Sequence, residues 1–214
     1  MRRMIGAFFM LAGAALLAGA MFLVLNNRQE DQTAQNFSQT VMPELHSEFL
    51  QAQQLRESLP TEPEAELLDY IPAEYLSPED LIMTEKTING YAYIGYLTIP
   101  DLNLELPVMS GWDSRRLQIA PCRFTGTIRG ENLVIMAHNY NSHFGRLEQL
   151  TVGSKLQFMD MDGKPWSFEV AAMDILPAEA VEEMTAGEYD LTLFTCTKNR
   201  THRVTIRCNK TENS

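Results

Sequence analysis

The stretch LTLFTCT, residues 191–197, organises both the fold and the chemistry of this chain. Its apolar run predicts a short buried strand that ends at Cys196. A polar loop follows, and the stretch RVTIRC, residues 203–208, predicts a second strand that returns beside the first. Antiparallel pairing of these two strands places Arg203 next to Cys196. A thiol beside a guanidinium is a candidate nucleophile with a charge stabiliser.

The composition restricts the class of protein. The 214 residues provide one domain of ordinary size and an extension, and 45% hydrophobic with 21% charged residues is typical of a globular chain. A net charge of −11 without a basic stripe argues against nucleic acid as a partner. Besides Cys196, only Cys122 and Cys208 occur; burial is favoured for both, and a disulfide between them is left open. The spacings CxxC and HExxH are absent, so no metal site is expected.

Residues 4–25 form an uncharged run without proline, long enough to cross a bilayer as a helix. Arg2 and Arg3 precede the run and an acidic flank follows it, which predicts a cytoplasmic tail at residues 1–3 and an extracellular remainder. The alternative is a cleaved signal peptide with residues 18–20, Ala-Gly-Ala, as its cleavage box. The apolar run continues five residues past that box, so we favour a single-pass membrane anchor.

Residues 26–83 are expected to form an extracellular stalk, or helical lead-in. Apolar residues recur there every four positions and form an amphipathic stripe that should pack on the domain: Phe37, Val41, Leu45 and Phe49. Pro43 within the stripe predicts a kink or a helix start. Residues 64–76 predict a short helix or a loop that crosses the domain, where it would be placed to act as a lid.

From Thr84 the pattern changes to short strands. Asn89-Gly90 is a strong hairpin signal between strands at 84–88 and 91–99. Residues 142–150 are expected to form one helix. Further strands are expected at 102–109, 121–127, 131–137, 154–160 and 164–176, before the closing pair. The pattern predicts a mainly β domain at 84–210, a closed eight-stranded antiparallel barrel with short helices, and a tail at 211–214.

The thiol needs a base, and the chain has four histidines. His46 lies on the lead-in, where we expect a solvated position, and His143 begins the predicted helix, where we expect a capping role. His138 directly follows an apolar strand and so emerges at a strand end, as Cys196 does. Strand ends gather at the rim of a barrel, which favours His138 as the partner, with His202 as the alternative.

Three segments together resemble the sortases, the cysteine transpeptidases of Gram-positive cell surfaces. Residues 191–196, LTLFTC, resemble their Thr-Leu-x-Thr-Cys motif, and residues 137–139, Ala-His-Asn, resemble their histidine motif. Residues 93–100, YIGYLTIP, resemble the segment that opens their sheet. The resemblance covers residues 91–208 in the family's order of His, Cys and Arg. It implies the eight-stranded sortase barrel on the outer side of the cell membrane.

The resemblance also implies roles for the site residues. The Cys196 thiolate would attack a peptide carbonyl carbon, and Arg203 would hold the substrate and the oxyanion. His138 would protonate the departing amine and later deprotonate the incoming one. From ordinary pKa values, the resting pair would be mostly neutral at pH 7. Thr195 and Asn139 are expected to contact the substrate.

Two other arginines compete with Arg203. Arg207 shares its face of the strand but lies about 13 Å further along, so a structural role is expected for it. Arg200 lies in the loop. We therefore predict Arg203 as the catalytic arginine.

The implied partners are surface proteins with a Leu-Pro-x-Thr-Gly-like sorting signal, and an amine acceptor on peptidoglycan or another protein. No cofactor is expected; a calcium loop at residues 160–163 fails the EF-hand pattern, and the acidic residues at 179–188 are interpreted as a solvated loop.

The Asp-Pro-aromatic lid motif of pilus-building sortases is missing, and residues 69–72 resemble it only loosely. A role in anchoring proteins is therefore expected, and the class of sortase stays open. The alternatives are a thiol hydrolase of the envelope and a catalytically silent binding barrel.

Overall fold

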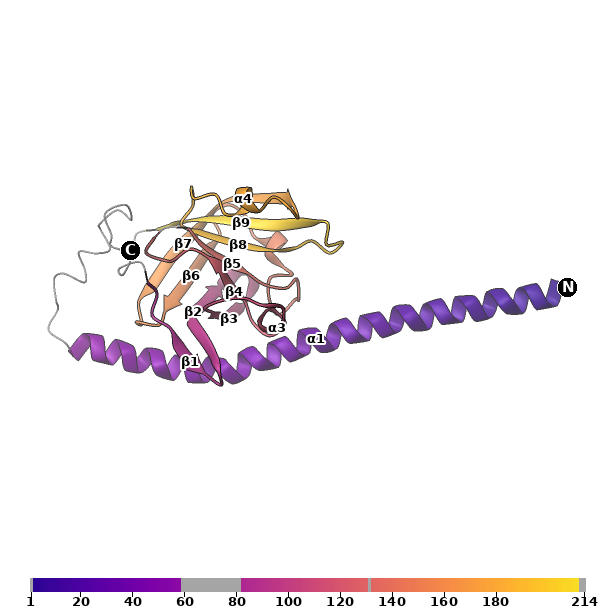
Figure 1. The fold of residues 1–214 in the computed structure, drawn as a ribbon, viewed down its shortest axis with the longest axis horizontal. Coiled ribbons are helices and arrows are strands. Elements are labelled where there is room, and N and C mark those ends of the chain that lie inside the picture. Colours follow the sequence, from indigo (N-terminus) through magenta and orange to yellow (C-terminus); the bar gives the residue numbers. More distant parts are fainter. Residues whose placement is uncertain (1, 59–81, 131, 212–214) are drawn as a thin grey trace.

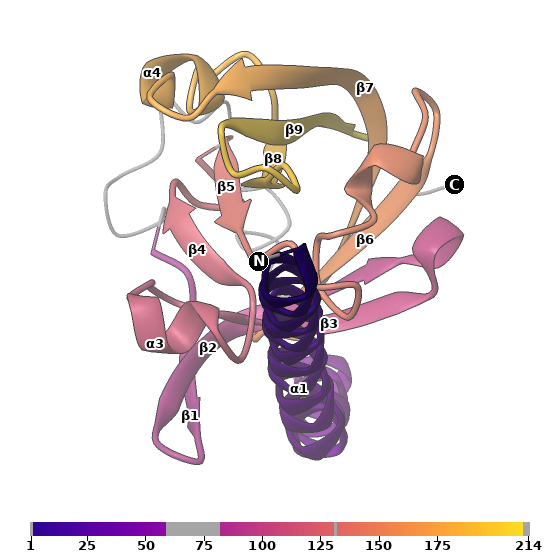
Figure 2. The same cartoon turned by 90° about the vertical axis from the view of Figure 1, so that its right-hand side faces the viewer.

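The computed structural model describes residues 2–58, 82–130 and 132–211, and the proposed lid at residues 64–76 lies outside this part of the chain. A long helix, α1 (Arg2–Ser58), passes one side of a β-barrel and extends far beyond it toward the N-terminus (Figure 1). Figure 2 looks along this helix and shows the barrel beside it. The barrel therefore lies against one continuous helix, which also carries the apolar N-terminal run.

The strands follow the predicted hairpins closely. They are β1 (Lys86–Ile88), β2 (Tyr91–Ile99), β3 (Leu104–Met109), β4 (Cys122–Thr125), β5 (Leu133–Met136), β6 (Lys155–Asp160), β7 (Pro165–Pro177), β8 (Leu191–Cys196) and β9 (His202–Lys210). Between them lie the short helices η3 (Pro100–Leu102), α3 (Ser114–Leu117), η4 (Leu147–Gln149) and α4 (Val181–Met184). Asn89 and Gly90 both have positive φ, as the predicted two-residue hairpin requires.

The sheet closes on itself. Its order is β1-β2-β3-β4-β5-β8-β9-β7-β6, and an additional pairing of β6 with β2 completes a ring of eight strands, with β1 outside it. The predicted closed barrel is thus confirmed, but it is mixed rather than antiparallel, because β3–β4 and β5–β8 are parallel pairs. Turn signals in the sequence identify only hairpins, which join antiparallel strands. The long connection between β5 and β8 allows β8 to run parallel to β5.

Side chains alternate between the barrel interior and its outer face. Leu133, Ile135, Leu191 and Leu193 belong to the inner core, whereas Phe194 packs in a separate outer cluster with Met184 of α4. Directly paired residues on neighbouring strands point to the same face. This alternation decides which residues near the end of β8 are available to a substrate.

The lead-in stripe packs on the barrel, as predicted. Val41, Leu45 and Phe49 are buried in a cluster with Tyr93 and Met109. The helix continues through Pro43 and bends where it passes β1 (Figure 1). Burying such side chains stabilises a fold by about 1.5–3 kcal/mol each, so this part of α1 is held as firmly as a core element.

The N-terminal half of α1, unlike the part that packs on the barrel, is apolar and exposed. The described helix contains an apolar 18-residue window, of mean hydropathy 1.7, that no part of the barrel covers. By length and composition this segment is able to cross a membrane, which is compatible with the predicted anchor.

Candidate active site

Cys196 differs from the other two cysteines in its exposure. Cys122 and Cys208 are fully buried, and all three thiols are free, so the disulfide left open above is not formed. Burial raises the pKa of both buried thiols to about 12, which keeps them protonated at neutral pH. Cys196 is half-buried at the end of β8. It is therefore the thiol that a substrate is able to reach.

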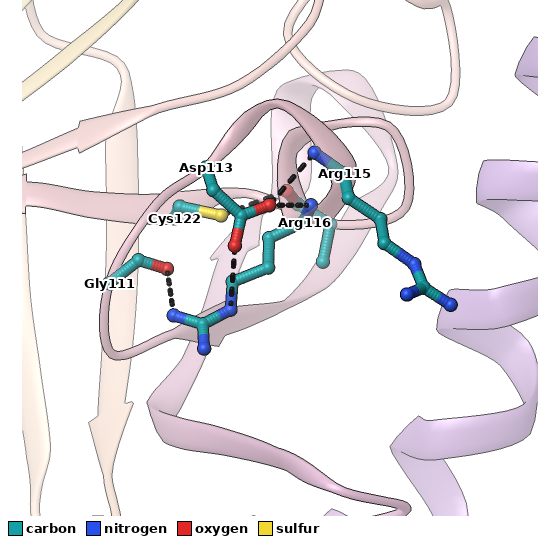
Figure 3. Close-up of polar contacts among 6 residues, drawn as sticks. Gly111, Asp113, Arg115, Arg116 and Cys122 are labelled. Carbon is teal, nitrogen blue, oxygen red and sulfur yellow. Dashed lines mark hydrogen bonds and ion pairs between the residues drawn. The ribbon is translucent and has the colours of Figure 1, made fainter.

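The turn before β4 shows how Cys122 is enclosed (Figure 3). Asp113 caps α3: its Oδ1 accepts from the backbone N–H groups of Arg115 and Arg116, both at 2.8 Å. Its Oδ2 also pairs with Arg116 Nε at 3.3 Å, and the Arg116 guanidinium donates to the Gly111 carbonyl at 3.4 Å. The Cys122 thiol behind this turn donates to a backbone carbonyl, that of Ala120, at 3.5 Å. Its role is structural.

His138 and Cys196 lie at adjacent positions because β5 and β8 are parallel. Two hydrogen bonds continue that register beyond the strand ends. Thr195 Oγ1 donates to the Ala137 carbonyl at 2.8 Å, and Asn139 Nδ2 donates to a carbonyl one residue past Cys196, that of Thr197, at 3.4 Å. Because Ala137 belongs to the inner core, His138 and Cys196 both face outward.

Arg203 is the direct partner of Cys196 across the β8–β9 pair and faces outward with it. Among the described residues, its guanidinium makes one hydrogen bond, to the His202 carbonyl at 3.3 Å. Arg207 lies opposite Thr192, at the other end of the ladder. The structure thus brings together His138, Cys196 and Arg203, the three residues that the sequence selected.

Arg207 is occupied by other contacts. Its side chain is buried; Nε pairs with Asp174 at 2.8 Å, and Nη2 donates to the Glu183 carbonyl at 2.6 Å. Its guanidinium also lies 5.2 Å from the centre of the Tyr189 ring. These contacts tie β9 to β7 and to the segment around α4, in agreement with the structural role expected for Arg207.

The other three histidines lie elsewhere. His202 is exposed and bonded to Thr201 Oγ1 at 2.8 Å. His46 is not simply solvated, because its Nε2 lies 3.1 Å from Glu105 Oε1 in the seam between α1 and the barrel. His143 is fully buried, and burial together with the nearby His138 lowers its pKa to about 4. Of the four histidines, His138 is the one at the strand end beside Cys196, so it stays the candidate base.

The loop that carries His138 is not the helix expected at residues 142–150. It contains turns and the single turn of η4. The backbone folds back on itself: the Phe144 N–H donates to the His138 carbonyl at 3.2 Å, and the Gly145 N–H donates to the Tyr140 carbonyl at 2.8 Å. A Cβ at Gly145 would lie 2.4 Å from the Asn139 carbonyl oxygen, so only glycine fits this approach. Tertiary contact thus overrides the local preference, and His143 is a core residue rather than a cap.

The imidazole of His138 lies in a mixed electrostatic environment. Burial lowers its pKa, the Arg200 guanidinium lowers it further, and the carboxylate of Glu30 opposes both. Its ring centre is 5.0 Å from that of Tyr140, with a tilt of 37°. The neutral imidazole is therefore favoured at neutral pH.

Thr195 and Asn139 have structural partners in this arrangement. The Thr195 side chain faces inward and is buried, and its hydroxyl is used by the bond to Ala137 described above. The Asn139 amide is half-buried and holds the two strand ends together. Both side chains thus hold the strand ends that carry His138 and Cys196. The expected contact with substrate, through the hydroxyl or backbone of Thr195 and through Asn139, stays a prediction.

An aromatic ladder beside Cys196 was not anticipated from the sequence. Phe194 lies edge-to-face with Phe124 at 5.4 Å, and Phe124 stacks on Trp112 at 5.8 Å. Trp112 is 48% exposed, and Met184 of α4 packs in the same outer cluster as Phe194. Phe194 has the same parity as Cys196, which is the signal that could have placed an apolar surface next to the thiol.

Comparison with known proteins agrees with the motifs. The Sortase domain family matches residues 97–211, which is more than half of the chain. Sortase C from Clostridium perfringens SM101 is 20% identical, with 78% of this chain and 99% of that chain covered and a TM-score of 0.55. A lid mutant of sortase A from Corynebacterium diphtheriae is 19% identical, with 80% and 96% covered and a TM-score of 0.53. No curated protein matches the chain. These solved structures share its fold, and the match to the family domain shows that the chain belongs to the sortase family.

Proposed function

We propose that this protein is a membrane-anchored cysteine transpeptidase that cleaves a Leu-Pro-x-Thr-Gly-like sorting signal and transfers the protein to an amine of the cell wall. The observation that carries the proposal is the meeting of three side chains on one outer face. Cys196 has Arg203 as its direct strand partner and His138 at the adjacent end of a parallel strand.

The proposed reaction has two steps. The Cys196 thiolate attacks the carbonyl carbon of the scissile bond, the C–N bond breaks, and the amine leaves with a proton from His138. An amine acceptor then attacks the thioester, gives a proton to His138, and releases the thiolate. In both steps Arg203 donates hydrogen bonds to the oxygen that carries the developing negative charge.

The aromatic ladder supports a substrate that is apolar next to the scissile bond. Phe194, buried two residues before Cys196, contacts the half-buried Phe124, which stacks on the exposed Trp112. Leucine and proline side chains would bury apolar surface there. One solved structure of Clostridium perfringens sortase C, of similar fold, contains the C-terminal cell wall sorting motif. We place the sorting signal of this protein's substrates along the ladder.

The apolar part of α1 supports the proposed location. We assign residues 4–25 to the membrane, the N-terminus to the cytoplasm and the barrel to the outer side. In this location the enzyme would meet surface proteins as they leave the membrane and acceptor amines in the wall.

A direct test uses the full chain in detergent micelles. Incubation with a panel of sorting-signal peptides should give a mass adduct on Cys196 and release the C-terminal fragment. Adding an amine should convert the adduct into a new amide, whereas an envelope hydrolase would give the free acid only. Folded protein that forms no adduct with any peptide of the panel would contradict the proposal.

The two outward arginines of β9 should behave differently when replaced by lysine. Arg203→Lys loses the forked hydrogen-bond geometry, and we expect kcat/KM to fall roughly 10²- to 10³-fold. Arg207→Lys loses its bond to the Glu183 carbonyl, so the free energy of unfolding should fall by about 1–3 kcal/mol while kcat/KM changes little. Peptide kinetics and denaturation of both variants test the assignment; the opposite pattern would transfer the catalytic role to Arg207.

A further inference from the structure

The helix before the barrel reaches the loop that carries His138. Asp31 of α1 accepts two hydrogen bonds from Ser142: its Oδ1 from the backbone N–H at 2.9 Å, and its carbonyl oxygen from the hydroxyl at 3.2 Å. The same hydroxyl also contacts the Asp31 carboxylate. The preceding residue, Glu30, accepts a hydrogen bond on Oε2 from the Tyr140 hydroxyl at 3.3 Å. Two neighbouring side chains of α1 thus hold two residues of one catalytic loop.

Tyr140 connects this attachment to the imidazole. Its ring is 7% exposed and lies between two histidine rings, 5.0 Å from His138 and 5.6 Å from His143, measured between centroids. The Phe144 N–H bond to the His138 carbonyl also fixes the backbone of His138 in the same loop as Tyr140, and the two rings are in contact. A displacement of α1 at Glu30 would therefore be transmitted to His138.

The charged and titratable groups around His138 come from four segments of the chain. Helix α1 supplies the carboxylate of Glu30, and the β8–β9 loop supplies the guanidinium of Arg200. The loop of His138 itself supplies Tyr140 and His143, and β8 supplies Cys196. Arg200 disfavours the imidazolium, and Glu30 favours it. Glu30 is thus the carboxylate that offsets Arg200 at this position.

We propose that Glu30 and Asp31 are positioning residues of the active site, through which helix α1 orients His138 and sets its charge environment. Asp31 holds the loop in place through Ser142, and Glu30 acts through Tyr140 and through its charge. This inference rests on the proposed function, in which His138 is the acid and the base. Since α1 continues into the apolar segment, the proposal makes the membrane helix part of the catalytic unit rather than a tether.

The test separates the charge of Glu30 from its hydrogen bond. Glu30→Gln keeps an acceptor for Tyr140 and removes the negative charge, so the pKa of His138 should fall. The acid limb of the kcat/KM profile should then move to lower pH. Because the thiolate–imidazolium form becomes rarer, kcat/KM at the optimum should fall roughly three- to tenfold. Asp31→Ala should instead lower kcat/KM at every pH, by up to about 10²-fold, without moving the limb, because it loosens the loop.

The matched control is Glu48→Gln, which removes the same charge from the same helix at a residue paired with Lys86, 3.4 Å away. Its profile should coincide with that of the wild type. A second readout follows the titration of the His138 ring by NMR in the full-length, histidine-labelled protein, with the resonance assigned from His138→Gln. Should Glu30→Gln not fold, Tyr140→Phe replaces it and should shift the titration in the same direction.

The outcomes are distinct. A His138 titration in Glu30→Gln that matches the one in Glu48→Gln overturns the inference, whatever the activity. A wild-type protein that forms no acyl adduct overturns the proposed function, while the NMR titration still decides whether Glu30 acts on His138.

Discussion

Replacing Cys196 by alanine should lower the rate of sorting-signal cleavage and transfer by at least about 10⁴-fold, because no other group supplies the nucleophile. Peptide binding should persist, since the Cys196→Ala variant retains the aromatic ladder and Arg203. The measurement is turnover of a fluorogenic sorting-signal peptide, with fluorescence anisotropy for binding. The thioester adduct should also disappear from the mass spectrum.

The other cysteines provide the control. Cys208→Ala changes a fully buried thiol that faces the barrel core, so we expect a modest loss of stability and kcat/KM within a few-fold of the wild type. Residual turnover of Cys196→Ala near the wild-type rate, or loss of turnover in Cys208→Ala with the fold intact, would refute the assignment of the nucleophile.

Leu45→Ala should lower the free energy of unfolding by about 2–5 kcal/mol, the cost of a large-to-small change in a packed core. Leu45 is fully buried where α1 meets the barrel, in the cluster that contains Tyr93 and Met109. The expected loss is large for a helix that precedes the domain, because removing its side chain leaves a cavity between α1 and β2 and β3. Denaturant unfolding of the full chain in mild detergent measures it.

Leu50→Ala is the matched control on the same helix. Leu50 is 60% exposed, so its replacement should change the stability by no more than about 0.5 kcal/mol. Equal effects of the two substitutions would mean that α1 does not pack on the barrel in solution. A clear difference would show that a catalytic domain cut from the chain must keep α1 through Phe49.

Part of the candidate site could be predicted from local sequence patterns. Cys196 and His138 each follow an apolar run, and their shared position at strand ends was visible in the sequence. The choice of Arg203 over Arg207, which shares its face, followed from their distances along one strand, and the structure places Arg203 opposite Cys196. These features depend on residues near in sequence, for which the period of a strand and a hairpin connection suffice.

The sequence did not show why His138 lies beside Cys196. In an antiparallel neighbour, the C-terminal ends of β5 and β8 would lie at opposite edges; their parallel pairing brings both to one edge. The aromatic ladder combines Trp112, Phe124 and Phe194 from three separate segments. Such contacts are decided by which strands become neighbours, and no local periodicity encodes that choice.

The sequence by itself determined the apolar N-terminal helix, the hairpins of the barrel, and the choice of Cys196 and His138 as candidate nucleophile and base. Each of these follows from hydrophobic period, turn chemistry or residue type within a short window. The tertiary structure alone decided the parallel β5–β8 pair, the compact loop around Gly145, and the reach of Glu30 and Asp31 into the site. The carboxylates of α1 lie 110 and 111 residues from their partners in the loop of His138, and only closure of the barrel against the helix brings them together.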